Sequence, residues 1–70
     1  MEVHGTVAQH DDTGGAVLLD DGSRLTYPLS AVQPEIRLLR SGQRVRLWVD
    51  GDPPQVRAVT LVSLPLRVRL

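Results

Sequence analysis

Few residues in this chain have the type and spacing that catalysis or metal binding requires. His4 and His10 lie six residues apart, and together with Asp12 they could imitate a metal site. The turn expected after Gln9 separates them, however, and the chain offers no further histidine and no cysteine as a ligand. Gly14-Gly15 lacks the flanking residues of a phosphate-binding loop, and no serine has the surroundings of an activated nucleophile. We therefore expect no enzymatic activity, no metal, no cofactor and no small-molecule substrate.

The pattern that best suits a binding surface is an alternating stretch at residues 44–49. Arg44, Arg46 and Trp48 are spaced two apart, so in a β-strand their side chains share one face, with neighbours about 6–7 Å apart. Guanidinium groups beside an exposed Trp form a platform on which bases stack and phosphates bind. The alternative is that protein covers Trp48, because a large apolar side chain is seldom left fully exposed.

The chain end offers such a cover. Residues 64–70 alternate four apolar residues with Arg67 and Arg69. This segment can fold back on Trp48, or add as an edge strand to a neighbouring chain, because free strand edges tend to pair. A disordered tail is the third alternative. We expect a homodimer or a protein partner to bind through this C-terminal strand, whose apolar residues are Leu64, Leu66, Val68 and Leu70.

Charge divides the chain into two halves, although the net charge is zero. Residues 1–35 hold six acidic residues against Arg24 alone, whereas residues 36–70 hold seven arginines against Asp50 and Asp52. This asymmetry points to charged partners, or else the two halves attract each other within one domain. No apolar run is long enough to span a membrane and no signal-peptide pattern opens the chain, so we expect no membrane contact and a cytoplasmic location.

The sequence pattern is that of β-strands. Seventy residues without cysteine form one small domain, which needs a closed sheet or self-association to stabilise its core. Alternating residues and the turn signals Asp21-Gly22 and Asp50-Gly51 predict five strands. The connection at residues 30–40 is the least regular, with one helical turn expected around residues 30–32. The expected strands lie near residues 2–9, 16–19, 24–29, 44–49 and 55–63.

Two local features refine this prediction. Pro28 has no backbone donor, so the third strand should end there or lie at an edge. Strict alternation in the fifth strand would place either Val56 at the surface or Arg57 in the core. A bulge would avoid this conflict, so we expect one there. These elements predict an all-β fold, a five-stranded antiparallel OB-type β-barrel over residues 1–63 with a tail over residues 64–70.

Several short motifs resemble the bacterial cold-shock domain in order and spacing. They are Gly5-Thr6-Val7, the segment ending Ser30-Ala31-Val32, the run L-R-S-G-Q-R-V at residues 39–45, and Pro54-Gln55. The corresponding family motifs are an opening G-x-V, a segment ending S-A-I, then L-x-x-G-Q-x-V and a closing P-Q-A, and the match covers roughly residues 3–63. The resemblance implies a cold-shock-like OB-fold that binds single-stranded nucleic acid through aromatic RNP-like motifs on its second and third strands.

The residues that would form that nucleic-acid-binding face are substituted here. None is a Phe, Trp or Tyr, and each lost stacking contact is worth about 1–3 kcal/mol. Tyr27 falls at an inward position, together with Leu18 and Leu25, so we expect a core-filling ring with its hydroxyl at the rim. By position, the resemblance places the face at Ala8, Gln9, His10, Gly15, Val17, Thr26, Pro28 and Leu29.

Two functions of different class follow from these observations. The favoured one is a protein-interaction or self-association module, which uses Trp48 and the C-terminal strand and has largely lost the family's nucleic-acid-binding face. The alternative is a single-stranded DNA- or RNA-binding protein whose binding is weak or relocated to Arg44, Arg46 and Trp48.

Overall fold

The computed structural model describes residues 1–33, 36 and 39–66. Over these residues the chain forms strands and one short 3-10 turn, and no α-helix. The expected helical turn is present, shifted by one residue toward the N-terminus. The elements are β1 (Glu2–Asp11), β2 (Gly14–Leu19), β3 (Arg24–Pro28), η1 (Leu29–Ala31), β4 (Arg44–Asp50) and β5 (Gln55–Leu61).

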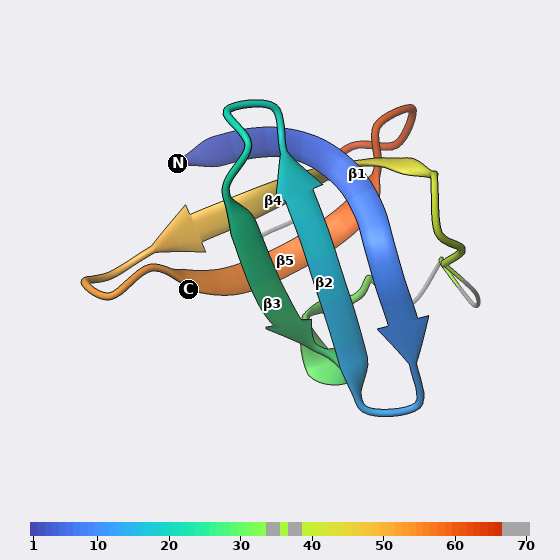
Figure 1. Ribbon diagram of the computed structural model, residues 1–70. Coiled ribbons are helices and arrows are strands. Elements are labelled where there is room, and N and C mark those ends of the chain that lie inside the picture. Colours follow the sequence, from blue (N-terminus) through green and yellow to red (C-terminus); the bar gives the residue numbers. More distant parts are fainter. Residues whose placement is uncertain (34–35, 37–38, 67–70) are drawn as a thin grey trace.

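The strands form one antiparallel sheet in the order β3-β2-β1-β4-β5. The sheet curls so strongly that its two end strands, β3 and β5, pack against each other. In Figure 1, β4 and β5 cross behind β1, β2 and β3, and the sheet forms a half-barrel. The predicted all-β, five-stranded antiparallel fold is confirmed, and its arrangement is compatible with an OB-type barrel.

A bend in β1 lets one strand serve both halves of the sheet. Its residues 2–6 pair with β4, and its residues 5–11 pair with β2. Between Val7 and Gln9 the register with β2 shifts, so that Ala8 is left without a partner there. An extra residue of this kind bends the strand and increases its twist. The bulge at Ala8 therefore lies where the strand turns from one half of the barrel to the other.

The core lies between the two halves of the sheet. Alternate residues of β4 point inward, and Val45, Leu47 and Val49 are all buried, as the sequence pattern predicts. The connection after η1 covers the edge of β5, where the Gln33 amide donates to the Val59 carbonyl at 3.0 Å. The largest fully buried side chains are Val7, Val17, Val45, Leu47, Val59 and Thr60.

Both local predictions about the strands are confirmed. Pro28 is the last residue of β3, which is an edge strand of the sheet. In β5 the register shifts between the pairs formed by Val56 and Ala58, which leaves Arg57 unpaired. Val56 is buried and Arg57 is exposed, so the bulge resolves the conflict in alternation.

Two expectations about strand faces and ends are wrong. Leu18 does not face inward, because it is 49% exposed whereas Val17 is 0% exposed. The run of apolar residues in β2 has no alternation from which its inward face could be read. β5 ends at Leu61 and not at Ser63, so the expected boundary at residue 63 falls within the turn that follows the strand.

Gly15 lies under the ring of Tyr27, its partner in the pairing of β2 with β3. A Cβ atom at Gly15 would meet the Tyr27 hydroxyl and the Gln9 carbonyl oxygen. We predict that Gly15→Ala lowers the free energy of unfolding by about 1–3 kcal/mol through overpacking, measured by urea denaturation. Gly42→Ala is the comparison, because its Cβ meets no atom within 4 Å and it adds only backbone strain at a φ of +91°. Only Gly15→Ala should also shift the NMR resonances of the His10 ring, and unchanged His10 signals would contradict this reading.

Candidate functional site

The outer face of β1, β2 and β3 carries part of the face implied by the family resemblance. Gln9, Thr26 and Pro28 are exposed there, and Leu29 just after β3 is 46% exposed. Ala8 is also exposed, at the bulge of β1.

Gly15 and Val17 do not belong to this face, which corrects the prediction. Val17 pairs with Val7 and Leu25 and points into the core, and Gly15 lies on the same inward side of β2. The outward positions of β2 are Gly14, Ala16 and Leu18. The prediction was one residue out of phase because the apolar sequence of β2 permits either parity.

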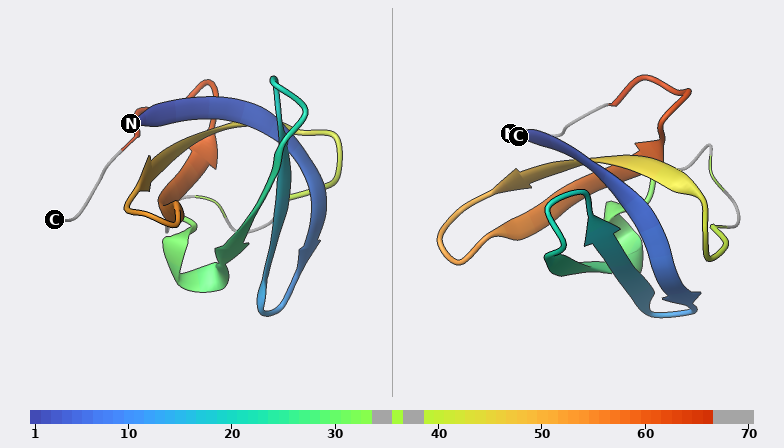
Figure 2. Two further views of the ribbon diagram at one scale, coloured as in Figure 1. Left: turned by 60° about the vertical axis from the view of Figure 1, so that its left-hand side comes forward. Right: turned by 45° about the horizontal axis from the view of Figure 1, so that its top comes forward.

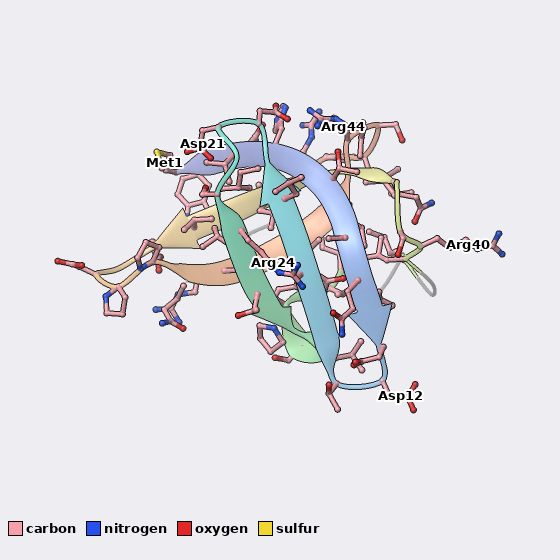
Figure 3. All side chains as sticks on the ribbon, viewed as in Figure 1. Met1, Asp12, Asp21, Arg24, Arg40 and Arg44 are labelled. Atoms are coloured by element: carbon pink, nitrogen blue, oxygen red, sulfur yellow. The ribbon has the colours of Figure 1, made fainter. Side chains whose placement is uncertain are left out.

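Small side chains leave an open hollow on this outer face, with a volume of about 270 Å³. Arg24 extends over β2 and β3 in Figure 3, and its Nη2 donates to Gln9 Oε1 at 3.4 Å. No ring projects outward from this hollow, because Tyr27 approaches it from the core side. The hollow is lined by Gln9, Asp11, Thr13, Gly14, Gly15, Ala16, Arg24, Thr26 and Tyr27.

His10 and Tyr27 form a pair at the rim of the core. Tyr27 is buried, as predicted, and its hydroxyl shares a hydrogen bond of 2.7 Å with His10 Nδ1. The two rings also stack, with centroids 5.9 Å apart. Burial, and then the negative charge of Asp11, raises the pKa of the Tyr27 hydroxyl. His10 is thus half-buried against protein and does not present a free ring for stacking.

Ionised carboxylates border the same face at both of its ends. Figure 3 shows Asp12 and Asp21 at the β1–β2 and β2–β3 turns. Hydrogen bonds from Thr13 lower the pKa of Asp11, and hydrogen bonds from Ser23 lower the pKa of Asp21. These side chains are therefore negatively charged at neutral pH and repel a phosphate backbone.

The outer face of β4 carries Arg44, Arg46 and Trp48 together, as the two-residue spacing predicts. Arg44 is paired within the chain, since its guanidinium donates to the two carboxylate oxygens of Asp20 at 2.7 and 3.1 Å. The same group donates to Thr6 Oγ1 at 3.2 Å. The ion pair joins the acidic half of the chain to the basic half.

Trp48 is half-buried and stands between Glu2 on β1 and Ala58 on β5, its partners in register. On β5 the outward residues Ala58 and Thr60 are buried, and Thr60 is 0% exposed. Three consecutive buried residues, 58–60, mean that β5 is covered on both faces. Trp48 therefore belongs to a second, covered apolar surface and is not an isolated exposed ring.

The segment of residues 62–66 lies beside this second surface. Arg46 Nη2 donates to the Val62 carbonyl at 2.6 Å, and Gln33 Nε2 donates to the Pro65 carbonyl at 3.3 Å. Figure 2 shows the chain turning back after β5 toward the start of β1. Leu64 and Leu66 are half-buried and do not form a strand, and Val68 and Leu70 lie outside the described residues.

Two buried polar atoms on the second surface have no hydrogen-bond partner among the residues that the structure describes. They are Arg46 Nε and Thr60 Oγ1, whose residues are partners in the pairing of β4 with β5. Sequence reasoning misses Thr60, Gln33 and Val62 as site residues, because their roles depend on contacts between distant parts of the chain. A run of apolar residues through β5 is the one signal that both of its faces are covered.

The structure does not assemble a metal site from the residues it describes. Within that part of the chain, no group of three His, Cys, Asp or Glu side chains is placed to hold an ion. His4 Nε2 instead lies 2.8 Å from a carboxylate oxygen of Glu2. Nor does any helix in the described ranges have the length and apolarity to cross a membrane.

Comparison with protein-family models and with curated proteins gives no match for this chain.

The Asp20–Arg44 ion pair predicts a specific pH dependence of stability. Hydrogen bonds from Arg44, followed by its charge, lower the pKa of Asp20. A lowered folded-state pKa contributes stability that is present above the unfolded value of about 3.9 and is lost as the pH falls through the folded value. We predict that Asp20→Asn is less stable than the wild type near pH 6, and that this difference shrinks below about pH 4. Arg44→Gln should show the same trend in urea denaturation, and a difference independent of pH would contradict the assignment.

The unpaired hydroxyl of Thr60 predicts a stabilising substitution. Thr60→Val keeps the branched shape and removes a buried hydroxyl that lacks a partner, which costs about 1–3 kcal/mol to bury. We expect the free energy of unfolding to rise by about 1 kcal/mol. Thr26→Val, at an exposed position of β3, should change it by less than about 0.5 kcal/mol. Loss of stability in Thr60→Val would show that the hydroxyl is hydrogen-bonded in solution.

Proposed function

We propose that this protein is a non-enzymatic OB-type module, a divergent relative of the cold-shock domain, that works by binding another polypeptide. The binding surface in this proposal is the outer face of β4 and β5 together with residues 62–66. A partner protein or a second copy of the chain would bind there.

The observation that carries the proposal is the covered apolar surface around Trp48, Ala58 and Thr60. Large apolar side chains seldom form a second layer outside a small barrel unless protein packs on them. Leu64 and Leu66, in the segment that follows β5, are half-buried as well. Continuing such a surface with a strand or an apolar segment of another chain is a common mode of peptide recognition.

The outer face of β1, β2 and β3 supports the proposal because its residues are poorly suited to binding nucleic acid. Leu18 and Leu29 are exposed there beside the open hollow, and Tyr27 is turned inward. Base stacking on outward rings, worth about 1–3 kcal/mol per base in single-strand binding, has no counterpart on the described part of this face. Ionised Asp11 and Asp21 add repulsion of phosphate.

Single-strand nucleic-acid binding through Arg44, Arg46 and Trp48 is the second candidate. It is favoured by the position of all three on one face of β4. Against it, Arg44 is engaged by the Asp20 carboxylate, so its guanidinium is not free for phosphate without breaking an ion pair.

Two measurements test the proposal. Sedimentation across a concentration series should show self-association, or Trp48 should respond to a polypeptide ligand. Leu64→Ser/Leu66→Ser should weaken the association, whereas Leu29→Ser on the other face should leave it unchanged. Titration with single-stranded oligothymidine should not change Trp48 fluorescence up to about millimolar ligand at low salt. Oligonucleotide binding that weakens steeply with added salt would instead support the second candidate.

A further inference from the structure

The guanidinium of Arg46 lacks a counter-ion within the described part of the chain. Arg44 and Arg57 each pair with a carboxylate, of Asp20 and Asp50 respectively. Arg46 is half-buried, yet within the described residues its guanidinium donates only to the neutral carbonyl of Val62. A cation removed from water needs an acceptor of opposite charge, or it remains poorly compensated.

Three hydrogen-bond donors converge at this point. Arg46 offers Nη2, now held by Val62, and Nε, which is buried and unpaired. Thr60, directly across from it on β5, offers an unpaired hydroxyl that is fully buried. A carboxylate takes a guanidinium through two parallel hydrogen bonds, and it can accept a third bond from a neighbouring hydroxyl.

We propose that Arg46 and Thr60 form a carboxylate-binding site, closed in the free protein by the Val62 carbonyl. The ligand is a Glu or Asp side chain of an extended peptide segment in a partner protein. On binding, its carboxylate takes the place of the Val62 carbonyl on Arg46 Nη2 and also accepts from Arg46 Nε and Thr60 Oγ1. Apolar residues beside it pack on Trp48. This inference rests on the proposed function and names the chemistry of its partner.

The surroundings favour a single carboxylate over a polyanion. Glu2 and Asp50 lie on either side of Trp48 on the same outer face. A nucleic-acid strand would bring its next phosphates against these carboxylates, whereas a peptide with one acidic residue avoids them.

The test uses the full chain and two blocked peptides, acetyl-Ala-Val-Glu-Val-Ala-amide and its Gln counterpart. We expect the Glu peptide to shift the Arg46 Nε–H resonance in ¹H–¹⁵N spectra and to change Trp48 fluorescence. The Gln peptide should bind at least about tenfold more weakly, because it lacks the charge. Equal binding of the two peptides, or no binding of the Glu peptide up to about millimolar concentration, would overturn the proposal.

Variants separate the site from general effects on the fold. Arg46→Lys keeps the charge but loses the paired donors, and Thr60→Val loses the hydroxyl while keeping the shape; each should weaken binding of the Glu peptide several-fold. Thr60→Ser should retain binding, and Arg57→Gln on the neighbouring strand should leave it unchanged. If Thr60→Val and Arg46→Lys bind the peptide like the wild type, the two atoms are simply hydrated and the site does not exist. Failure of this test with self-association intact and oligothymidine unbound would leave the proposed function standing.

Discussion

The bend in β1 is the constraint on which the rest of the structure depends. A short chain without disulfides closes its core only if one strand pairs in both halves of the sheet, and β1 does so across the bulge at Ala8. Gly5 lies in the region shared by both pairings, where a Cβ atom would meet Val17 and the Leu18 carbonyl. Close approach of β1 and β2 at this point requires a glycine. Val7 then enters the core between the two halves.

The curl also gives the molecule two outer faces of different character. The face of β1, β2 and β3 is open and polar, with a hollow where side chains are small. The face of β4 and β5 is covered, and its buried Thr60 and half-buried Trp48 resemble the edge of a second core. Inward-turned Tyr27 reaches His10 across Gly15, so the largest side chain of β3 supports the barrel and leaves no ring on the open face. The residues that build the barrel are thus kept, whereas the described part of its open face carries no aromatic ring for binding.

Strands whose residues alternate could be predicted from the sequence together with their faces. Val45, Leu47 and Val49 alternate with polar residues, and Thr26, Tyr27 and Pro28 leave only one sensible parity. In β2 the sequence A-V-L-L carries no such period, and the expectation of Leu18 in the core and Val17 on the surface is the reverse of what the structure shows. The burial of the outer face of β4 and β5 could not be predicted from local sequence. The exposure of Thr60 depends on packing against residues that are not its neighbours in sequence.

Gln33 links the connection after η1 both to β5 and to the segment that follows β5. Its backbone amide holds the edge of β5 at Val59, and its side chain holds the Pro65 carbonyl on the segment after β5. Lifting that segment would therefore also loosen the seam at which the connection after η1 closes the barrel. Amide hydrogen exchange at this seam would then become faster when the segment of residues 62–66 lifts and slower when it is held in place. The buried side chain of Gln33 thus couples the closure of the barrel to binding on the outer face of β4 and β5.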